Sequence, residues 1–63
     1  MNHKKMKELR LEKQMTQEEL ALKTGITDVM ICRIEQGEKE PSLRILRTIA
    51  YALGCKAADL IDE

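Results

Sequence analysis

The stretch TQEELALKTGITDVMICRIEQG, residues 16–37, has the start and stop signals of two short helices. Thr16 is a favourable N-cap, and Glu19 follows at the spacing of a capping box, in which each side chain bonds a backbone N–H of the first turn. Gly25 comes about two turns later, and glycine adopts the left-handed conformation that ends many helices at little cost. These signals predict a helix over about residues 17–24.

The second half of the stretch repeats these signals. Thr27 can cap a further helix, and Asp28 in its first turn favours the positive end of the helix dipole. Ile31 and Ile34 share one face of this helix, which leaves the opposite face for other contacts. Two short helices joined by a tight glycine-containing turn are the geometry of a helix-turn-helix, here about residues 17–36.

Apolar residues at helical spacing also occur on both sides of this stretch. They predict helices over about residues 3–14, 43–53 and 57–62. The side chains expected to face the core from the first two of these are Met6, Leu9, the stem of Lys13, Leu43, Leu46, Ile49, Ala50 and Leu53. No segment alternates with the period of a strand, so the expected fold is all-α, a compact five-helix bundle.

Length and charge exclude several classes of protein. The chain has 63 residues, which is enough for one domain, expected to span residues 1–63. Its formal net charge is zero, so the total charge indicates neither a nucleic-acid nor a membrane surface. The first residues lack the apolar segment of a signal peptide, and no apolar run approaches the ~20 residues of a membrane span. We therefore expect a cytoplasmic protein without membrane contact.

Residues that could carry out catalysis or bind a metal are few. Cys32 and Cys55 have no ligand-like spacing and His3 stands alone, so we expect no metal site and two reduced thiols. Cys55 is expected in the core, since it follows a helix end where an apolar residue fits. Because no nucleophile is paired with a base, we expect no catalytic residue, no cofactor and no small-molecule ligand.

From about Met6 to Ile61 the chain resembles the Cro/C1-type helix-turn-helix family of phage repressors and bacterial XRE-like regulators. The resemblance is carried by the strings LR, TQEELA, GI, IxRIExG, PSL and IAxALG, in that order. It implies a lambda-repressor-like bundle of five helices that binds double-stranded DNA, usually as a homodimer. It also implies an ion pair between Arg10 and Glu35, which we expect to be at least partly buried.

The resemblance further implies which residues contact DNA. Gln17 matches the residue that opens the second helix and contacts the DNA backbone or base edges, and Thr16 matches the cap beside it. Lys39 offers a phosphate contact in the loop after the third helix. The positions of the recognition surface itself are Thr27, Asp28, Val29, Cys32 and Arg33.

Several of these positions depart from the polar or basic residues that are usual in the family. Asp28 repels phosphates but can accept from a cytosine N4 amine, and Val29 can contact a thymine methyl group or pack partly inside. Arg33 can reach a guanine or a phosphate, or it forms a surface ion pair. The ion pair is disfavoured within the helix, because no acidic residue lies three or four positions away. Cys32 is either a small residue at a tolerant position or a redox switch. Arg44 contacts a phosphate or is simply solvated.

These observations predict a sequence-specific transcriptional regulator, more a repressor than an activator, that inserts residues 28–36 into the major groove. The alternatives are a protein-interaction module whose groove face has become acidic and apolar, and an enzyme. Because basic residues are few, we expect a homodimer on a near-palindromic operator with half-sites ~34 Å apart. The dimer contact is expected around Tyr51, Leu60 and Ile61. Without a ligand domain, control is expected through protein level, operator geometry or partners.

Overall fold

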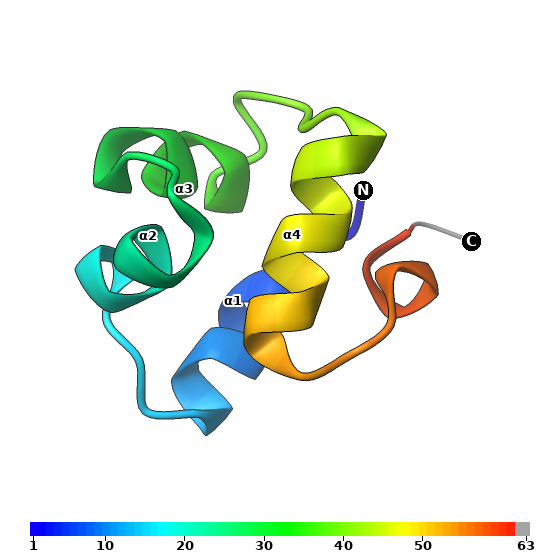
Figure 1. The fold of residues 1–63 in the computed structure, drawn as a ribbon. Helices are drawn as coiled ribbons and strands as arrows, with labels where there is room; N and C mark the ends of the chain where they lie inside the picture. Colours follow the sequence, from blue (N-terminus) through cyan, green and yellow to red (C-terminus); the bar gives the residue numbers. More distant parts are fainter. Residues whose placement is uncertain (62–63) are drawn as a thin grey trace.

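A computed structural model describes residues 1–61 (Figure 1). The helices are α1 (His3–Glu12), α2 (Gln17–Thr24), α3 (Asp28–Glu35), α4 (Leu43–Leu53) and the 3₁₀-helix η1 (Ala57–Leu60). The all-α prediction is confirmed. The predicted fifth α-helix is wrong, since η1 is a single 3₁₀ turn in which the N–H of Asp59 bonds the carbonyl of Lys56 at 2.9 Å. Position 62 of that predicted helix lies outside the described residues.

The predicted helix caps form. Thr16 Oγ1 accepts from the N–H of Glu19 at 3.0 Å, and Glu19 Oε1 accepts from the N–H of Thr16 at 3.0 Å, which completes the capping box. Thr27 Oγ1 accepts from the N–H of Met30 at 3.1 Å. Gly25 ends α2 in the left-handed conformation, with φ 72°. The helix-turn-helix is therefore specified by hydrogen bonds that are local in sequence.

The first helix differs from its prediction. It ends at Glu12 rather than at residue 14, because Gln14 adopts a left-handed backbone with φ 56° and turns the chain toward α2. Lys13 is exposed and is not a core residue, whereas Leu9 is half-buried and packs against the core. Arg10 is buried instead.

The core is aliphatic and draws on every helix. Its buried apolar residues are Met6, Met15, Leu20, Ala21, Ile31, Ile34, Leu46, Ile49, Ala50, Leu53 and Leu60. Leu43, expected in this group, is 55% exposed at the start of α4. Cys55 is half-buried and packs against the core from outside it. Leu60 is fully buried, so the expectation that it contributes to a dimer surface is wrong: the core of its own chain already covers it.

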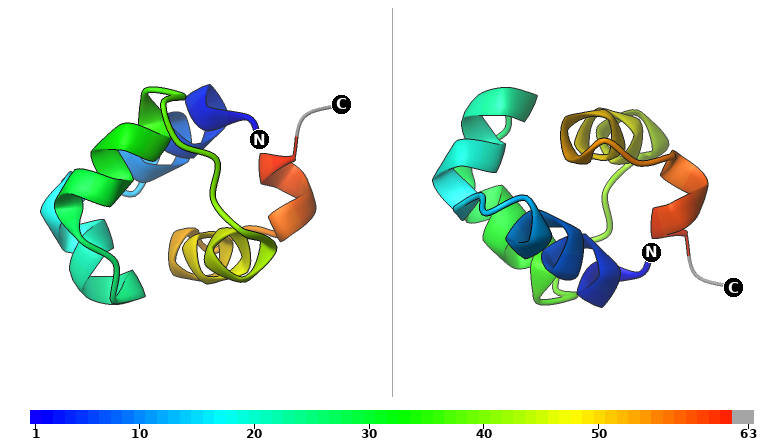
Figure 2. Two further views of the ribbon diagram at one scale, coloured as in Figure 1. Left: turned by 90° about the horizontal axis from the view of Figure 1, so that it is seen from above. Right: turned by 90° about the horizontal axis from the view of Figure 1, so that it is seen from below.

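The helices are arranged so that α2 and α3 form one side of the molecule (Figures 1 and 2). Figure 2 also shows the chain start beside η1, where the N–H of Asn2 donates to the carbonyl of Leu60 at 2.7 Å. The principal extents are 28 × 21 × 18 Å. No helix within residues 1–61 is long and apolar enough to cross a membrane.

The expected ion pair is confirmed and lies inside the protein. Arg10 Nε donates to Glu35 Oε2 at 2.6 Å and Nη2 donates to Oε1 at 3.0 Å, so the contact is bidentate. Arg10 Nη1 donates to the carbonyl of Met15 at 2.7 Å. The side chains of Arg10 and Glu35 are only 8% and 3% exposed. The pair thus joins the end of α1, the segment before α2 and the end of α3.

Replacing Glu35 by Ala should lower the free energy of unfolding by about 3–5 kcal/mol, because Arg10 would remain as a buried charge without its partner. Replacing Arg10 and Glu35 together by Met should cost less than about 2 kcal/mol, since no uncompensated charge remains. Urea denaturation followed by circular dichroism measures both. A Glu35→Ala variant as stable as the unmodified chain would contradict this account.

Candidate nucleic-acid interface

The outer face of α3 carries most of the predicted recognition residues. Ile31 and Ile34 are 0% and 1% exposed, so the helix is fixed to the body along that face. The exposed residues at its start and on its outer side are Thr27, Asp28, Val29 and Arg33. Val29 is 56% exposed and therefore does not pack inside, whereas Met30 is half-buried against the core.

Cys32 is half-buried on α3 and contacts a residue that the sequence interpretation missed. Gln36, just after α3, donates from Nε2 to Cys32 Sγ at 3.4 Å and is exposed. The four-residue spacing of Cys32 and Gln36 on one helix was the available signal, because such positions are neighbours on the helix surface. Gln36 therefore extends the polar part of this face beyond the predicted set.

The start of α2 lies next to the start of α3. A hollow of about 470 Å³ lies between these helix starts. It is lined by Arg10, Thr16, Gln17, Glu18 and Asp28. The fold thus brings Thr16 and Gln17 together with Asp28, although the two groups are about ten residues apart in sequence. Gln17 is half-buried, and its Nε2 donates to Glu35 Oε1 at 3.2 Å.

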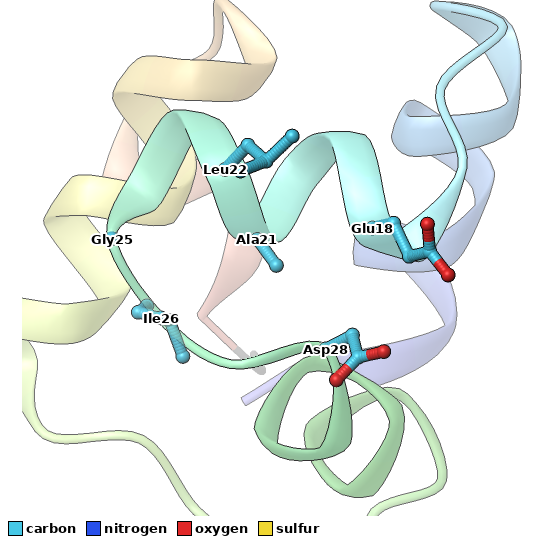
Figure 3. A pocket seen from close by; sticks show the side chains of 6 residues that line it. All are labelled: Glu18, Ala21, Leu22, Gly25, Ile26 and Asp28. Atoms are coloured by element: carbon cyan, nitrogen blue, oxygen red, sulfur yellow. The ribbon is translucent and has the colours of Figure 1, made fainter.

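A second, apolar groove lies between α2 and the turn that leads to α3 (Figure 3). It has a volume of about 410 Å³ and is lined by Glu18, Ala21, Leu22, Gly25, Ile26 and Asp28. Figure 3 shows Glu18 and Asp28 at the same end of this groove, from the first turns of the two helices. Glu18 was not predicted as a site residue. The sequence feature that could have pointed to it is the acidic residue that both α2 and α3 carry in the first turn.

Positive charge on this side is sparse. Lys39 is exposed in the loop between α3 and α4 and does not line the hollow at the helix starts; Glu38 and Glu40 flank it in sequence. The N-terminal ammonium of Met1 lies 3.1 Å from Glu40 Oε1, which offsets one of these negative charges. Arg44 is exposed in the first turn of α4. The predicted site residues therefore lie at the starts of α2 and α3, farther along α3 at Cys32 and Arg33, and at Lys39 in the loop.

The described residues contain no arrangement typical of a metal centre. Within residues 1–61 no three His, Cys, Asp or Glu side chains are grouped so that they could hold a metal ion. Burial, and then the negative charge of Asp59, raise the pKa of the Cys55 thiol. A raised pKa disfavours the thiolate, the form of cysteine that acts as nucleophile and metal ligand.

Comparison with known proteins agrees with this geometry. The family model described as Helix-turn-helix matches residues 6–60. An uncharacterized HTH-type transcriptional regulator from Archaeoglobus fulgidus is 39% identical over 56 residues, which is 89% of this chain and 80% of that protein. One from Methanothermobacter thermautotrophicus is 45% identical over 49 residues, 78% of this chain and 71% of that protein.

Two solved structures share the fold. The restriction-modification controller protein C.AhdI from Aeromonas hydrophila superposes with a TM-score of 0.90 at 29% identity, covering 94% of this chain and 89% of that one. An HTH_3 family transcriptional regulator from Vibrio cholerae superposes with a TM-score of 0.86 at 27% identity; the match covers 94% of this chain but 33% of that protein. The chain therefore belongs to the helix-turn-helix family of Cro/C1-type, DNA-binding transcriptional regulators.

Proposed function

We propose that this protein is a repressor that inserts α3 into the major groove of its operator. The observation that carries the proposal is the two-sided character of α3, whose Ile31 and Ile34 are buried while Thr27, Asp28, Val29 and Arg33 are exposed. A helix fixed by one face and free on the other can enter a groove about 12 Å wide. Occupying an operator that overlaps a promoter is sufficient to repress it.

Phosphate contacts come from several weak donors in this proposal. The hydroxyls of Thr16 and Thr27 each accept a cap hydrogen bond, which leaves the hydroxyl proton to be donated to a phosphate oxygen. Lys39 and Arg44 add positive charge from the loop and from α4. Such contacts position the protein on the duplex without reading its sequence.

Base contacts come from the outer side of α3. The carboxylate of Asp28 accepts from the N4 amine of a cytosine, Val29 contacts a thymine methyl group, and Arg33 donates to a guanine or a phosphate. Cys32 contributes a small side chain that the groove tolerates. Asp28 is repelled by the phosphates around it, so it favours the correct sequence at the expense of general affinity.

A homodimer compensates for the few basic residues. Tyr51 is 90% exposed on α4 and Ile61 is 49% exposed after η1, so both are available to a second copy. Two recognition helices related by a two-fold axis would read half-sites ~34 Å apart. The chain is proposed to act in the cytoplasm, where the operator DNA is.

A second candidate function is favoured by the groove of Figure 3. Leu22 at this groove is 84% exposed, and Glu18 and Asp28 make its end acidic. Such a surface suits a protein partner rather than DNA, which would make the chain a protein-interaction module. The two functions differ in salt dependence, because DNA binding releases counterions and weakens steeply as salt rises.

Fluorescence anisotropy should detect binding to an operator selected from a random DNA pool, with affinity that falls steeply between 50 and 200 mM salt, on the scale of about 10³ if some six phosphates are contacted. Arg33→Ala should weaken this binding by about 5- to 100-fold through loss of one contact. Lys56→Ala, which removes an exposed positive charge just before η1, is the control and should have little effect. Salt-independent binding would favour the protein-interaction module.

Asp28→Asn should relax the base preference at one position of the half-site, because an amide also donates and no longer singles out cytosine. It should also strengthen binding to scrambled DNA by a few fold, since one negative charge near the phosphates is removed. Binding to operators substituted at each base pair measures this. Glu12→Gln, which makes the same charge change on α1, is the control. An unchanged base preference in Asp28→Asn would exclude the proposed cytosine contact.

Sedimentation equilibrium should show a dimer at concentrations of about 100 µM, and Tyr51→Glu should shift it to monomer, because a buried unpaired carboxylate opposes association. Leu11→Glu provides the control, since Leu11 is 55% exposed on a different helix. A monomer at the highest concentration of the unmodified chain would count against the homodimer.

A further inference from the structure

Glu35 has a second hydrogen-bond donor besides the arginine. Gln17 Nε2 lies 3.2 Å from Glu35 Oε1, the same oxygen that accepts from Arg10 Nη2 at 3.0 Å. The Glu35 side chain is 3% exposed, whereas Gln17 is half-buried and lines the hollow at the starts of α2 and α3. A residue of the proposed DNA interface is therefore anchored on a buried ion pair.

The chemistry of the pair determines which end of the Gln17 carboxamide faces inward. A carboxylate that binds a guanidinium only accepts hydrogen bonds, so Gln17 must turn its NH₂ group toward Glu35. The carbonyl oxygen Oε1 then faces away from Glu35. One N–H of the NH₂ group remains for a further contact. Without such an anchor, the amide is free to turn over and present either end.

We infer that Glu35 is a positioning residue that holds Gln17 so that its outward edge reads an adenine. This inference rests on the proposed function, because it assumes that the hollow faces DNA. A phosphate oxygen could accept the remaining N–H, but it carries no proton to donate to Gln17 Oε1, which would then be met only by water. Adenine offers both partners in the major groove, since its N6 amine donates to the carbonyl and its N7 accepts the remaining N–H.

A double-mutant cycle tests the coupling between Glu35 and Gln17. Arg10→Met with Glu35→Met removes the acceptor without leaving a buried charge, so this pair variant should fold. On an operator selected by the unmodified chain, Gln17→Ala should weaken binding about 10-fold, the scale of one or two hydrogen bonds. In the pair variant the same substitution should cost less than about 3-fold.

Val29→Ala is the matched control for the cycle, because Val29 belongs to the same interface but does not contact Glu35. Its cost should be the same in both backgrounds. An equal cost of Gln17→Ala in both backgrounds would overturn the positioning role. If the costs of Gln17→Ala and Val29→Ala shrink together, Glu35 only supports α3, and the inference is likewise wrong.

The base that Gln17 reads is tested with operators substituted one base pair at a time. Gln17→Ala should abolish the preference for A·T at a single position and leave the other positions unchanged. Uniform weakening on every sequence, with a smaller dependence on salt, would identify a phosphate contact and contradict the adenine contact.

Nuclear magnetic resonance tests the anchor without DNA. The side-chain NH₂ protons of Gln17 should exchange with solvent more slowly than those of the exposed Gln14, and the difference should disappear in the Met pair variant. If the unmodified chain selects no DNA sequence, the proposed function fails. This exchange measurement then tests by itself whether Glu35 holds the Gln17 amide. Equal exchange of Gln14 and Gln17 would show that Glu35 does not hold the amide.

Discussion

The arrangement of the helix-turn-helix depends on one buried ion pair. Arg10 and Glu35 form a bidentate contact at 2.6 and 3.0 Å, and a further N–H of Arg10 bonds the carbonyl of Met15 at 2.7 Å. Helices as short as α2 and α3, with eight residues each, are unstable alone. Within residues 1–61 no buried side-chain nitrogen or oxygen lacks a partner. Because the pair joins Arg10 at the end of α1 to Glu35 at the end of α3, it fixes how these two helix ends meet.

The aliphatic core complements this polar link. With one aromatic residue in the chain, Tyr51, and that residue exposed, packing depends on small and branched side chains. The buried side chains of Ile31 and Ile34 hold α3 on the core, and those of Leu20 and Ala21 hold α2 on it. Ala21 is small, which lets α2 and the turn that follows it come close. The face that remains outside is what a binding partner can contact.

Charge on that face has two effects that oppose each other. Glu18 and Asp28 lie in the first turns of α2 and α3, where a negative charge stabilises the positive end of a helix dipole. The same carboxylates repel the phosphates of DNA. With a formal net charge of zero, the chain has little general attraction for a polyanion. In the proposed complex, selectivity at the base edges and the two-fold repetition of the proposed dimer would supply what general attraction does not.

The sequence by itself determined α2, α3 and α4, the caps of α2 and α3, and the apolar face of α3. Thr16, Glu19 and Gly25 act on backbone groups a few residues away, so their effect can be read locally. The Arg10–Glu35 pair was foreseen only through the family resemblance. The exposure of Leu43, the burial of Leu60 and the anchoring of Gln17 on Glu35 were decided by the tertiary structure. Burial and long-range hydrogen bonds depend on which distant segments pack together, and no local pattern contains that information.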